Sequence, residues 1–300
     1  MMNKVIITGS AGFLGKNVVE SILKKGYFVY AIVRPGSAHN IRIQETDQLK
    51  KVEIDLADIG KLSEYIDDTC DAFLHLAWGG NSRNDFQGQY QNVDYTLKAL
   101  DAARSLSCKR FICTGSQAEY GPQAGLTTEE MLPDPDTAYG AAKLAALYLS
   151  RERAVQLGID WIWGRVFSVY GRYEPSGRML PDLIRALQDG RDFSMTAALQ
   201  DWDYLYDGDA AEALVALLER GHAGEIYNIA NGDIHPLRYF TEQLREYFAP
   251  DRELIYGKSS RIASSLRPSV EKIRRDTGWQ AKTEFMDGIR MTYHNNYFAI

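Results

Sequence analysis

The chain contains few cysteines and no long apolar run. Its 300 residues include three cysteines, Cys70, Cys108 and Cys113, whose spacing is not that of a metal site. An odd number of isolated cysteines is typical of a reduced chain without a disulfide framework. No apolar run approaches the roughly 18 residues that a membrane span requires, and the N-terminus does not resemble a signal peptide. We therefore expect a soluble, cytoplasmic protein with no metal site and no membrane contact.

Runs of basic residues are also missing. The chain has 34 Lys and Arg against 40 Asp and Glu, which gives a formal net charge of −6. A surface that binds nucleic acid carries clustered positive charge, so we expect no nucleic-acid partner. If this acidic protein binds phosphate groups, it must use local features such as helix N-termini and single arginines.

The first half of the chain alternates short apolar runs with amphipathic helical stretches. We predict strands at residues 4–9, 27–33, 50–56, 71–77, 110–116 and 160–171, and long helices at 91–106 and 138–158. Strands separated by helices at this spacing form right-handed crossovers and a parallel sheet covered on both faces. The sequence therefore predicts an α/β fold with a Rossmann-type, doubly wound parallel sheet.

This alternation becomes less regular after about Gly171. Amphipathic helices are predicted at residues 179–190, 209–221 and 237–248, with short strands such as 225–230 between them. We interpret residues 1–170 as an NAD(P)-binding Rossmann domain. Residues 171–300 are then mainly a smaller α+β substrate-binding lobe, from which some segments can return to the sheet.

A glycine-rich turn, "VIITGSAGFLG" at residues 5–15, follows the first predicted strand and opens a helix. Gly9 permits a sharp exit from the strand, Gly12 lets the backbone approach a pyrophosphate, and Gly15 allows the helix to pack closely on the sheet. The helix N-terminus adds N–H donors and a positive dipole. A lone glycine triplet also fits a structural turn, but this strand-then-helix setting favours a dinucleotide site. Ala11, Phe13 and Leu14 complete the predicted cofactor loop.

The end of the second predicted strand indicates which dinucleotide binds. A carboxylate there would bind the ribose hydroxyls of NAD, whereas this chain has Arg34, which can pair with the 2′-phosphate of NADP. The alternative is an ordinary solvent-facing arginine, so NAD stays possible. Asp55 and Leu56, after the third strand, are candidates for the adenine edge on position alone.

Tyr139 and Lys143 stand four residues apart in "YGAAK" and so share one face of the helix after the fifth strand. That strand ends in Ser116. The carboxyl ends of parallel strands are where such folds bind ligands. The pair alone would arise by chance, and its position is what makes these three residues catalytic candidates.

With these residues in place, the chain resembles the extended short-chain dehydrogenases/reductases, in the NAD-dependent epimerase/dehydratase family that modifies nucleotide sugars. The matching pieces run in the family's order along nearly the whole chain: "GSAGFLG", "IDLAD", "LHLAW", "CTGSQAEYG", "YGAAK", "GRVFSVYG", "DWDYLYDGDAAEA", "YNIANG" and "LRPSVEKIRRDTGW".

The resemblance implies a role for each candidate. Tyr139 exchanges a proton with the sugar oxygen. Since a free phenol has a pKa near 10, it needs nearby positive charge, which Lys143 supplies while also holding the nicotinamide ribose. Ser116 positions the reacting oxygen by a hydrogen bond. Leu76, Ala77 and Trp78, after the fourth strand, lie on the cofactor side, and Trp78 is also a candidate wall of the sugar pocket. The preceding His75 is expected to be a core histidine.

Departures from the family pattern narrow the chemistry. Members that remove water across C5–C6 carry an Asp-Glu pair where this chain has Gln117 and Ala118. Neither residue transfers protons well, so a 4,6-dehydratase is not expected. The leading hypothesis is an NADP(H)-dependent reductase of a nucleotide-linked 4-keto-6-deoxy sugar. An NAD-dependent 4-epimerase is the nearest alternative, and a non-catalytic NAD(P)-sensing protein is a distant one.

The resemblance places the nucleotide-sugar substrate in the second lobe. Arg267 matches a family arginine that contacts the diphosphate, which suits a bidentate guanidinium. Ser168 replaces a usual asparagine, and Gln200 replaces an arginine found in many members, so the binding mode is open. The candidate substrate contacts are Trp78, Ser116, Gln117, Phe167, Ser168, Arg178, Gln200 and Arg267. A homodimer built on helices 91–106 and 140–157 is also implied.

Overall fold

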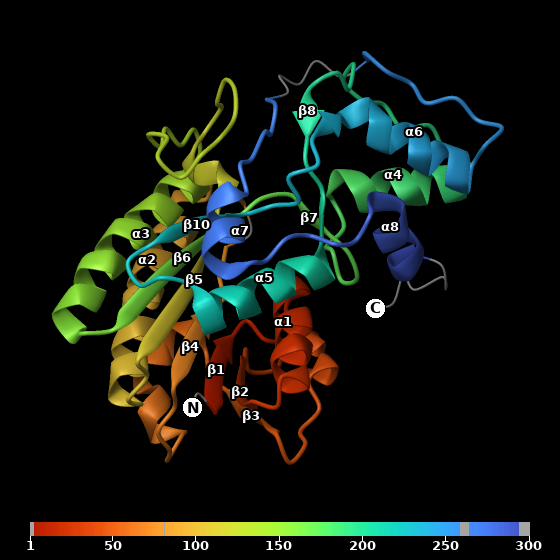
Figure 1. The fold of residues 1–300 in the computed structure, drawn as a ribbon. Helices are drawn as coiled ribbons and strands as arrows, with labels where there is room; N and C mark the ends of the chain where they lie inside the picture. The colour runs from red at the N-terminus through yellow and green to blue at the C-terminus, as the bar shows by residue number, and fades with distance from the viewer. Residues whose placement is uncertain (1–2, 81, 259–263, 294–300) are drawn as a thin grey trace.

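Seven parallel strands form the main sheet, in the order β10-β6-β5-β4-β1-β2-β3 (Figure 1). A computed structural model describes residues 3–80, 82–258 and 264–293. The strands are β1 (Lys4–Thr8), β2 (Phe28–Val33), β3 (Leu49–Glu53), β4 (Ala72–His75), β5 (Arg110–Ser116), β6 (Asp160–Val166) and β10 (Ile226–Ile229). In the register of the sheet, Ile7 of β1 lies between Ala31 of β2 and Leu74 of β4. The predicted Rossmann-type sheet is confirmed.

Helices cover both faces of this sheet. On one face, α1 (Phe13–Lys24) and α5 (Asp207–Arg220) pack together over a core that includes Val5 and Ile7, and α7 (Glu271–Thr277) lies beside β10. On the other face, α2 (Phe86–Ser105) and α3 (Ala138–Leu157) cover Phe73 and Phe111. Three 3-10 helices, η1 (Ala38–Arg42), η2 (Leu56–Glu64) and η3 (Gln117–Glu119), follow β2, β3 and β5. The continuous apolar character of the strands follows from this burial on both sides.

A smaller lobe lies beyond the carboxyl ends of the strands, at the top right of Figure 1. It contains α4 (Met179–Gln188), α6 (Leu237–Phe248) and α8 (Phe285–Tyr293). Two short strand pairs complete it: β7 (Val169–Tyr170) with β9 (Leu205–Tyr206), and β8 (Asp201–Trp202) with β11 (His235–Pro236). Its core is aromatic, and Tyr204 stacks on Phe285 and meets Phe240 edge-on.

Three differences from the predicted elements bear on the architecture. The strand predicted at 160–171 divides into β6, which ends at Val166, and β7, which pairs with β9 of the smaller lobe. The helix expected at 91–106 begins earlier, at Phe86, because Asp85 caps it. The strand predicted at 225–230 is β10, one of the segments after residue 170 that return to the sheet, where it pairs with β6 as the edge strand. Together with α5, it returns the chain to the first domain after residue 170.

In the part of the chain that the structure describes, no helix is long and apolar enough to cross a membrane. The same residues hold no group of three or more His, Cys, Asp or Glu that could bind a metal ion. All three cysteines are buried and free.

Candidate active site

The glycine-rich loop connects β1 to α1 at the carboxyl end of the sheet. Gly9 has a φ of +69°, in the left-handed region that favours glycine, and a Cβ on it would lie 2.9 Å from the backbone nitrogen of Ala77. A Cβ on Gly15 would lie 2.0 Å from the carbonyl oxygen of Gly9, so α1 packs directly on the loop. Gly12 is the N-cap of α1. Ala11 is buried, whereas Phe13 and Leu14 are half-buried. A glycine cradle beneath a helix N-terminus fits a dinucleotide pyrophosphate.

Positive charge gathers beside this loop. Arg34 is exposed directly after β2. Arg42, at the end of η1, donates from Nη1 to the Ala11 carbonyl at 3.2 Å and stacks over the Tyr173 ring at 4.2 Å. Burial, and then the charges of Arg42 and Arg34, lower the pKa of His39 between them. The sequence analysis missed Arg42, because only the fold of η1 brings it back to the glycine loop.

At the end of β3, the Asp55 carboxylate accepts the Ala57 N–H at 3.0 Å and so caps η2, which begins at Leu56. Asp55 is exposed and Leu56 is half-buried. The carboxylate therefore has a local structural use at the position predicted for the adenine edge.

The side chains of Thr8 and Gln89 hold the loop after β4. The Thr8 hydroxyl accepts the N–H groups of Leu76 and Ala77, at 3.2 Å and 3.3 Å. The Trp78 indole donates to Gln89 Oε1 of α2 at 2.8 Å, which fixes the ring. The preceding His75 is buried, and its Nδ1 lies 2.9 Å from the Thr8 hydroxyl. Burial lowers the pKa of His75 to about 3, so it is a neutral core histidine as expected.

Tyr139, Lys143 and Trp78 come together at the start of α3. The buried Lys143 donates from Nζ to the Thr114 carbonyl of β5 at 2.6 Å. The same ammonium lies 3.7 Å from the centroid of the Trp78 ring and 6.0 Å from that of Tyr139. The Trp78 and Tyr139 rings meet edge-on with centroids 6.1 Å apart. Lys143 therefore places a desolvated positive charge beside the half-buried tyrosine.

Ser116 ends β5 two residues after the Thr114 carbonyl that holds Lys143. Its side chain is the N-cap of η3 and accepts the Ala118 N–H at 3.2 Å. The start of α3 presses on this turn, since a Cβ on Gly140 would lie 2.2 Å from the Ala118 carbonyl oxygen. The glycine of "YGAAK" thus allows α3 to approach the turn that carries Ser116. These contacts bring the three predicted catalytic residues to one end of the sheet.

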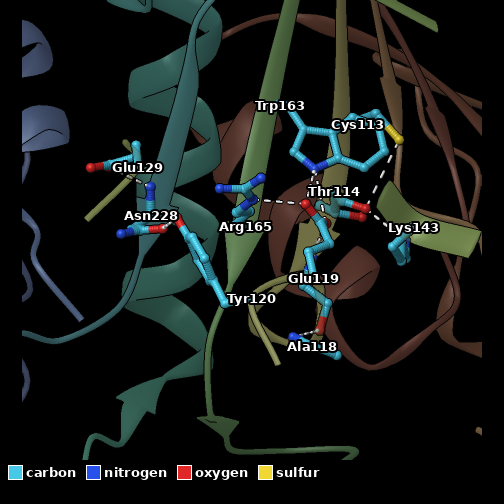
Figure 2. A network of polar contacts seen from close by, with 11 residues as sticks. Cys113, Thr114, Ala118, Glu119, Tyr120, Glu129, Lys143, Trp163, Arg165 and Asn228 are labelled. Atoms are coloured by element: carbon cyan, nitrogen blue, oxygen red, sulfur yellow. Dashed lines mark hydrogen bonds and ion pairs between the residues drawn. The ribbon is translucent and has the colours of Figure 1, made fainter. Parts of the chain in front are cut away.

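Behind Ser116 lies a buried polar network that the sequence analysis did not find. Figure 2 shows Glu119 at its centre, with Trp163 and Arg165 of β6 directed toward the carboxylate. A signal for it was present, because Ser116 and Glu119 stand at the S-x-x-E spacing of a capping box, and both of its hydrogen bonds are formed.

The candidate substrate residues divide between the two lobes. Gln117 is half-buried beside Ser116, and Phe167 is buried against Tyr120, with Ser168 half-buried next to it. In the smaller lobe, the Arg267 guanidinium pairs with Asp201, the neighbour of Gln200. Arg178 is exposed at the N-cap of α4. The structure therefore brings Arg267 and Gln200 together around β8 and places Arg178 on a different element.

Comparison with known proteins places this site in a family. The model of the NAD dependent epimerase/dehydratase family matches residues 5–230. The chain belongs to that family. It is of the extended short-chain dehydrogenase/reductase type, whose members are nucleotide-sugar epimerases and dehydratases.

Individual relatives cover almost the whole chain. The dTDP-glucose 4,6-dehydratase of Neisseria meningitidis is 26% identical over 97% of this chain and 92% of its own. The UDP-glucose 4-epimerase of Corynebacterium glutamicum is 25% identical over 92% of this chain and 90% of its own. The crystal structure of UDP-glucuronic acid 4-epimerase from Bacillus cereus, in complex with NAD, has a TM-score of 0.86 at 23% identity and covers 97% of both chains. This structural likeness shows the shared fold.

Proposed function

We propose that this family member is an NADP(H)-dependent reductase of a nucleotide-linked 4-keto-6-deoxy sugar. The observation that carries the choice is the positive charge at the end of β2. Arg34 is exposed there, Arg42 of η1 contacts the neighbouring glycine loop, and no carboxylate occupies the position of Arg34. A guanidinium at this place suits the 2′-phosphate of NADP. A preference for NADP in turn favours a reductase, because a reductase consumes NADPH.

In this proposal, each catalytic residue acts on the sugar carbonyl. The bound reduced cofactor supplies a hydride. Tyr139 donates its phenolic proton to the carbonyl oxygen, so that C=O becomes CH–OH. Ser116 donates a hydrogen bond to the same oxygen. Lys143, fixed by the Thr114 carbonyl, stabilises the negative charge that develops on the tyrosine oxygen and holds the cofactor ribose. The residues proposed to contact the substrate are Trp78, Gln117, Phe167, Ser168, Arg178, Gln200 and Arg267.

Three observations bear on the competing functions. Gln117 and Ala118 follow Ser116, and neither supplies the acid and base that a 4,6-dehydration needs. A 4-epimerase with bound NAD remains the second candidate, supported by the epimerase relative and by the NAD-bound neighbour of the same fold. A non-catalytic sensor would have no use for a buried lysine beside Tyr139.

The proposal also includes a cytoplasmic homodimer, a cofactor domain at 1–170 and a mainly substrate-binding lobe at 171–300.

The reductase is tested by following NADPH absorbance with a panel of nucleotide-linked 4-keto-6-deoxy sugars. We expect stoichiometric NADPH consumption with at least one of them. Tyr139→Phe should lower kcat by about 100-fold or more, while NADPH binding stays within about threefold. Inversion of an ordinary nucleotide sugar without net cofactor consumption would favour the epimerase instead. Full turnover by Tyr139→Phe would contradict the assigned chemistry in either case.

A further inference from the structure

Glu119 is a buried carboxylate whose partners converge on Ser116. Its side chain is fully buried. Oε1 accepts the backbone N–H of Ser116 at 2.8 Å and the Trp163 indole N–H at 3.0 Å. Oε2 accepts from Nε of Arg165 at 2.7 Å, and that guanidinium is also buried (Figure 2). A carboxylate with this many donors is fixed in place.

The end of β5 is shaped to admit this carboxylate. A Cβ on Gly115 would lie 2.3 Å from Glu119 Oε1 and 2.0 Å from Trp163 Nε1, so only glycine leaves the room. The donors Trp163 and Arg165 stand two residues apart on β6 and so point to the same side of the sheet. In the pairing of β5 with β6, Arg165 lies opposite Gly115. Three elements thus meet at one carboxylate.

The network orients the Ser116 hydroxyl in a way that suits catalysis. The Ser116 oxygen accepts the Ala118 N–H at 3.2 Å, and Glu119 holds the Ser116 backbone at the same time. A hydroxyl whose oxygen accepts a backbone hydrogen bond keeps its own hydrogen for a further acceptor. That hydrogen is the one that the proposed mechanism directs at the sugar carbonyl.

We infer that Glu119 is a positioning residue, which acts through Ser116 by fixing its backbone and hence the direction of its hydroxyl. The inference rests on the proposed function only in that Ser116 contacts the reacting oxygen, a role that a reductase and an epimerase share. A buried ion pair is a poor source of net stability, because desolvation opposes the attraction. Net stability therefore does not explain why the Glu119–Arg165 pair is present, whereas the positioning of Ser116 does.

The first test is a double-mutant cycle between Glu119→Gln and Ser116→Ala. Glutamine keeps the volume of glutamate, but its neutral amide replaces the carboxylate that accepts from Arg165. This substitution disturbs the network. We expect Glu119→Gln to lower kcat by about 10- to 100-fold, the loss typical of a misplaced catalytic group, with KM for NADPH changed less than about threefold. In the Ser116→Ala background the same substitution should lower kcat by less than about threefold, because the hydroxyl that Glu119 orients is gone.

A second variant guards against loss of folding. Glu119→Leu with Arg165→Met removes both charges, a replacement that buried pairs commonly tolerate. It should fold with a lowered melting temperature, because the N–H groups of Ser116 and Trp163 lose their acceptor, and it should still show the lowered kcat. The matched control is Glu129→Gln, since Glu129 also accepts a backbone N–H, that of Asn228 at 2.8 Å, but makes no hydrogen bond to Ser116. Glu129→Gln should keep kcat within about twofold.

The results separate this inference from the proposed function. The double-mutant cycle is run with whichever reaction the wild type catalyses. If that reaction is an epimerisation, the proposed reductase function is wrong, but the cycle still tests the role of Glu119. Amide hydrogen exchange at Ser116 is measured on the same proteins without substrate, and it should be faster in both Glu119 variants than in Glu129→Gln. Three results would each overturn the inference. They are additive losses of kcat in the cycle, full kcat in a folded Glu119→Leu/Arg165→Met variant, and unchanged amide hydrogen exchange at Ser116.

Discussion

Arg34 lies directly after β2, and its charged side chain is exposed. A charge-assisted hydrogen bond to a phosphate contributes about 1.5–3 kcal/mol. We therefore expect Arg34→Asp to raise KM for NADPH by about 10- to 100-fold. The new carboxylate can accept hydrogen bonds from the ribose hydroxyls of NADH, so KM for NADH should not rise. Steady-state kinetics with the two cofactors measures both effects, and an equal loss for both would contradict a role in 2′-phosphate recognition.

Glu174 is a second residue with a measurable signature. Burial raises the pKa of Glu174 to about 7 from an ordinary 4.5, and among the described residues its Oε2 has no hydrogen-bond partner. The folded state therefore holds a proton that the unfolded state releases. The protonated Glu174 carboxyl therefore contributes to the stability of the folded state. This contribution is fully present below about pH 4.5 and is lost as the pH rises through about 7.

Glu174→Gln should remove this dependence, because an amide does not titrate. We expect the melting temperature of the variant, relative to the wild type, to be higher at pH 8 than at pH 5, by the several degrees that about 2 kcal/mol produces. Melting curves of both proteins across pH 5–8 measure it. A constant difference over that range would show that Glu174 has an ordinary pKa.

At the scale of the elements, the approach of α3 to the β5–η3 turn positions the catalytic groups. Tyr139 and Lys143 both lie in the first two turns of α3, and the helix meets the Ala118 carbonyl at Gly140. Gly140→Ala places a Cβ 2.2 Å from that carbonyl oxygen, so the helix must move away. We expect kcat/KM to fall by about 10-fold or more, with about 1–3 kcal/mol of lost stability.

The matched control for Gly140→Ala lies at the other end of α3. Gly158 has a φ of +65° and open space around its Cβ position. Gly158→Ala should therefore cost about 1 kcal/mol in backbone strain and leave kcat/KM near the wild-type value. If both variants lose activity in proportion to their loss of stability, the contact at Gly140 is not what positions α3.

Much of this arrangement could be predicted from the sequence, because it depends on local periodicity. Alternating strands and helices predict the parallel sheet, and the carboxyl ends of parallel strands predict that Ser116 approaches Tyr139 and Lys143. The S-x-x-E spacing could mark Glu119 as a helix cap, but its pairing with Arg165 could not be predicted, since the two are 46 residues apart and burial is invisible in sequence. Which segment after residue 170 returns to the sheet could not be predicted for a related reason, because the four residues of β10 carry too little periodicity to indicate which sheet they join.

At the scale of the whole molecule, α2 and α3 expose apolar side chains on the same side of the sheet. Tyr148, Leu149 and Val155 of α3 are 45%, 51% and 75% exposed, and Phe86 and Tyr90 of α2 are 71% and 61% exposed. Exposed apolar groups on neighbouring helices are typical of an interface. They support the homodimer expected from the family resemblance.

Leu149→Glu should therefore weaken that dimer by placing a charge on the apolar surface of α3. We expect the wild type to sediment as a dimer at micromolar concentration and the variant mainly as a monomer. Ile41→Glu is the control, because Ile41 is 80% exposed but lies on η1, away from these helices. A monomeric wild type, or dimers of equal strength in all three proteins, would contradict this interface.

The pairing of β10 with β6 has a consequence for how such a protein can be divided. The chain leaves the sheet after β6, builds part of the smaller lobe and then supplies α5 and β10 to the first domain. Neither lobe is therefore a contiguous segment of the gene. A fragment that stops at residue 170 would present β6 as an unpaired edge and uncover the apolar face of α1, both of which favour aggregation. The smaller lobe therefore cannot be replaced by a single exchange of the C-terminal half, because that exchange would also remove α5 and β10 from the first domain.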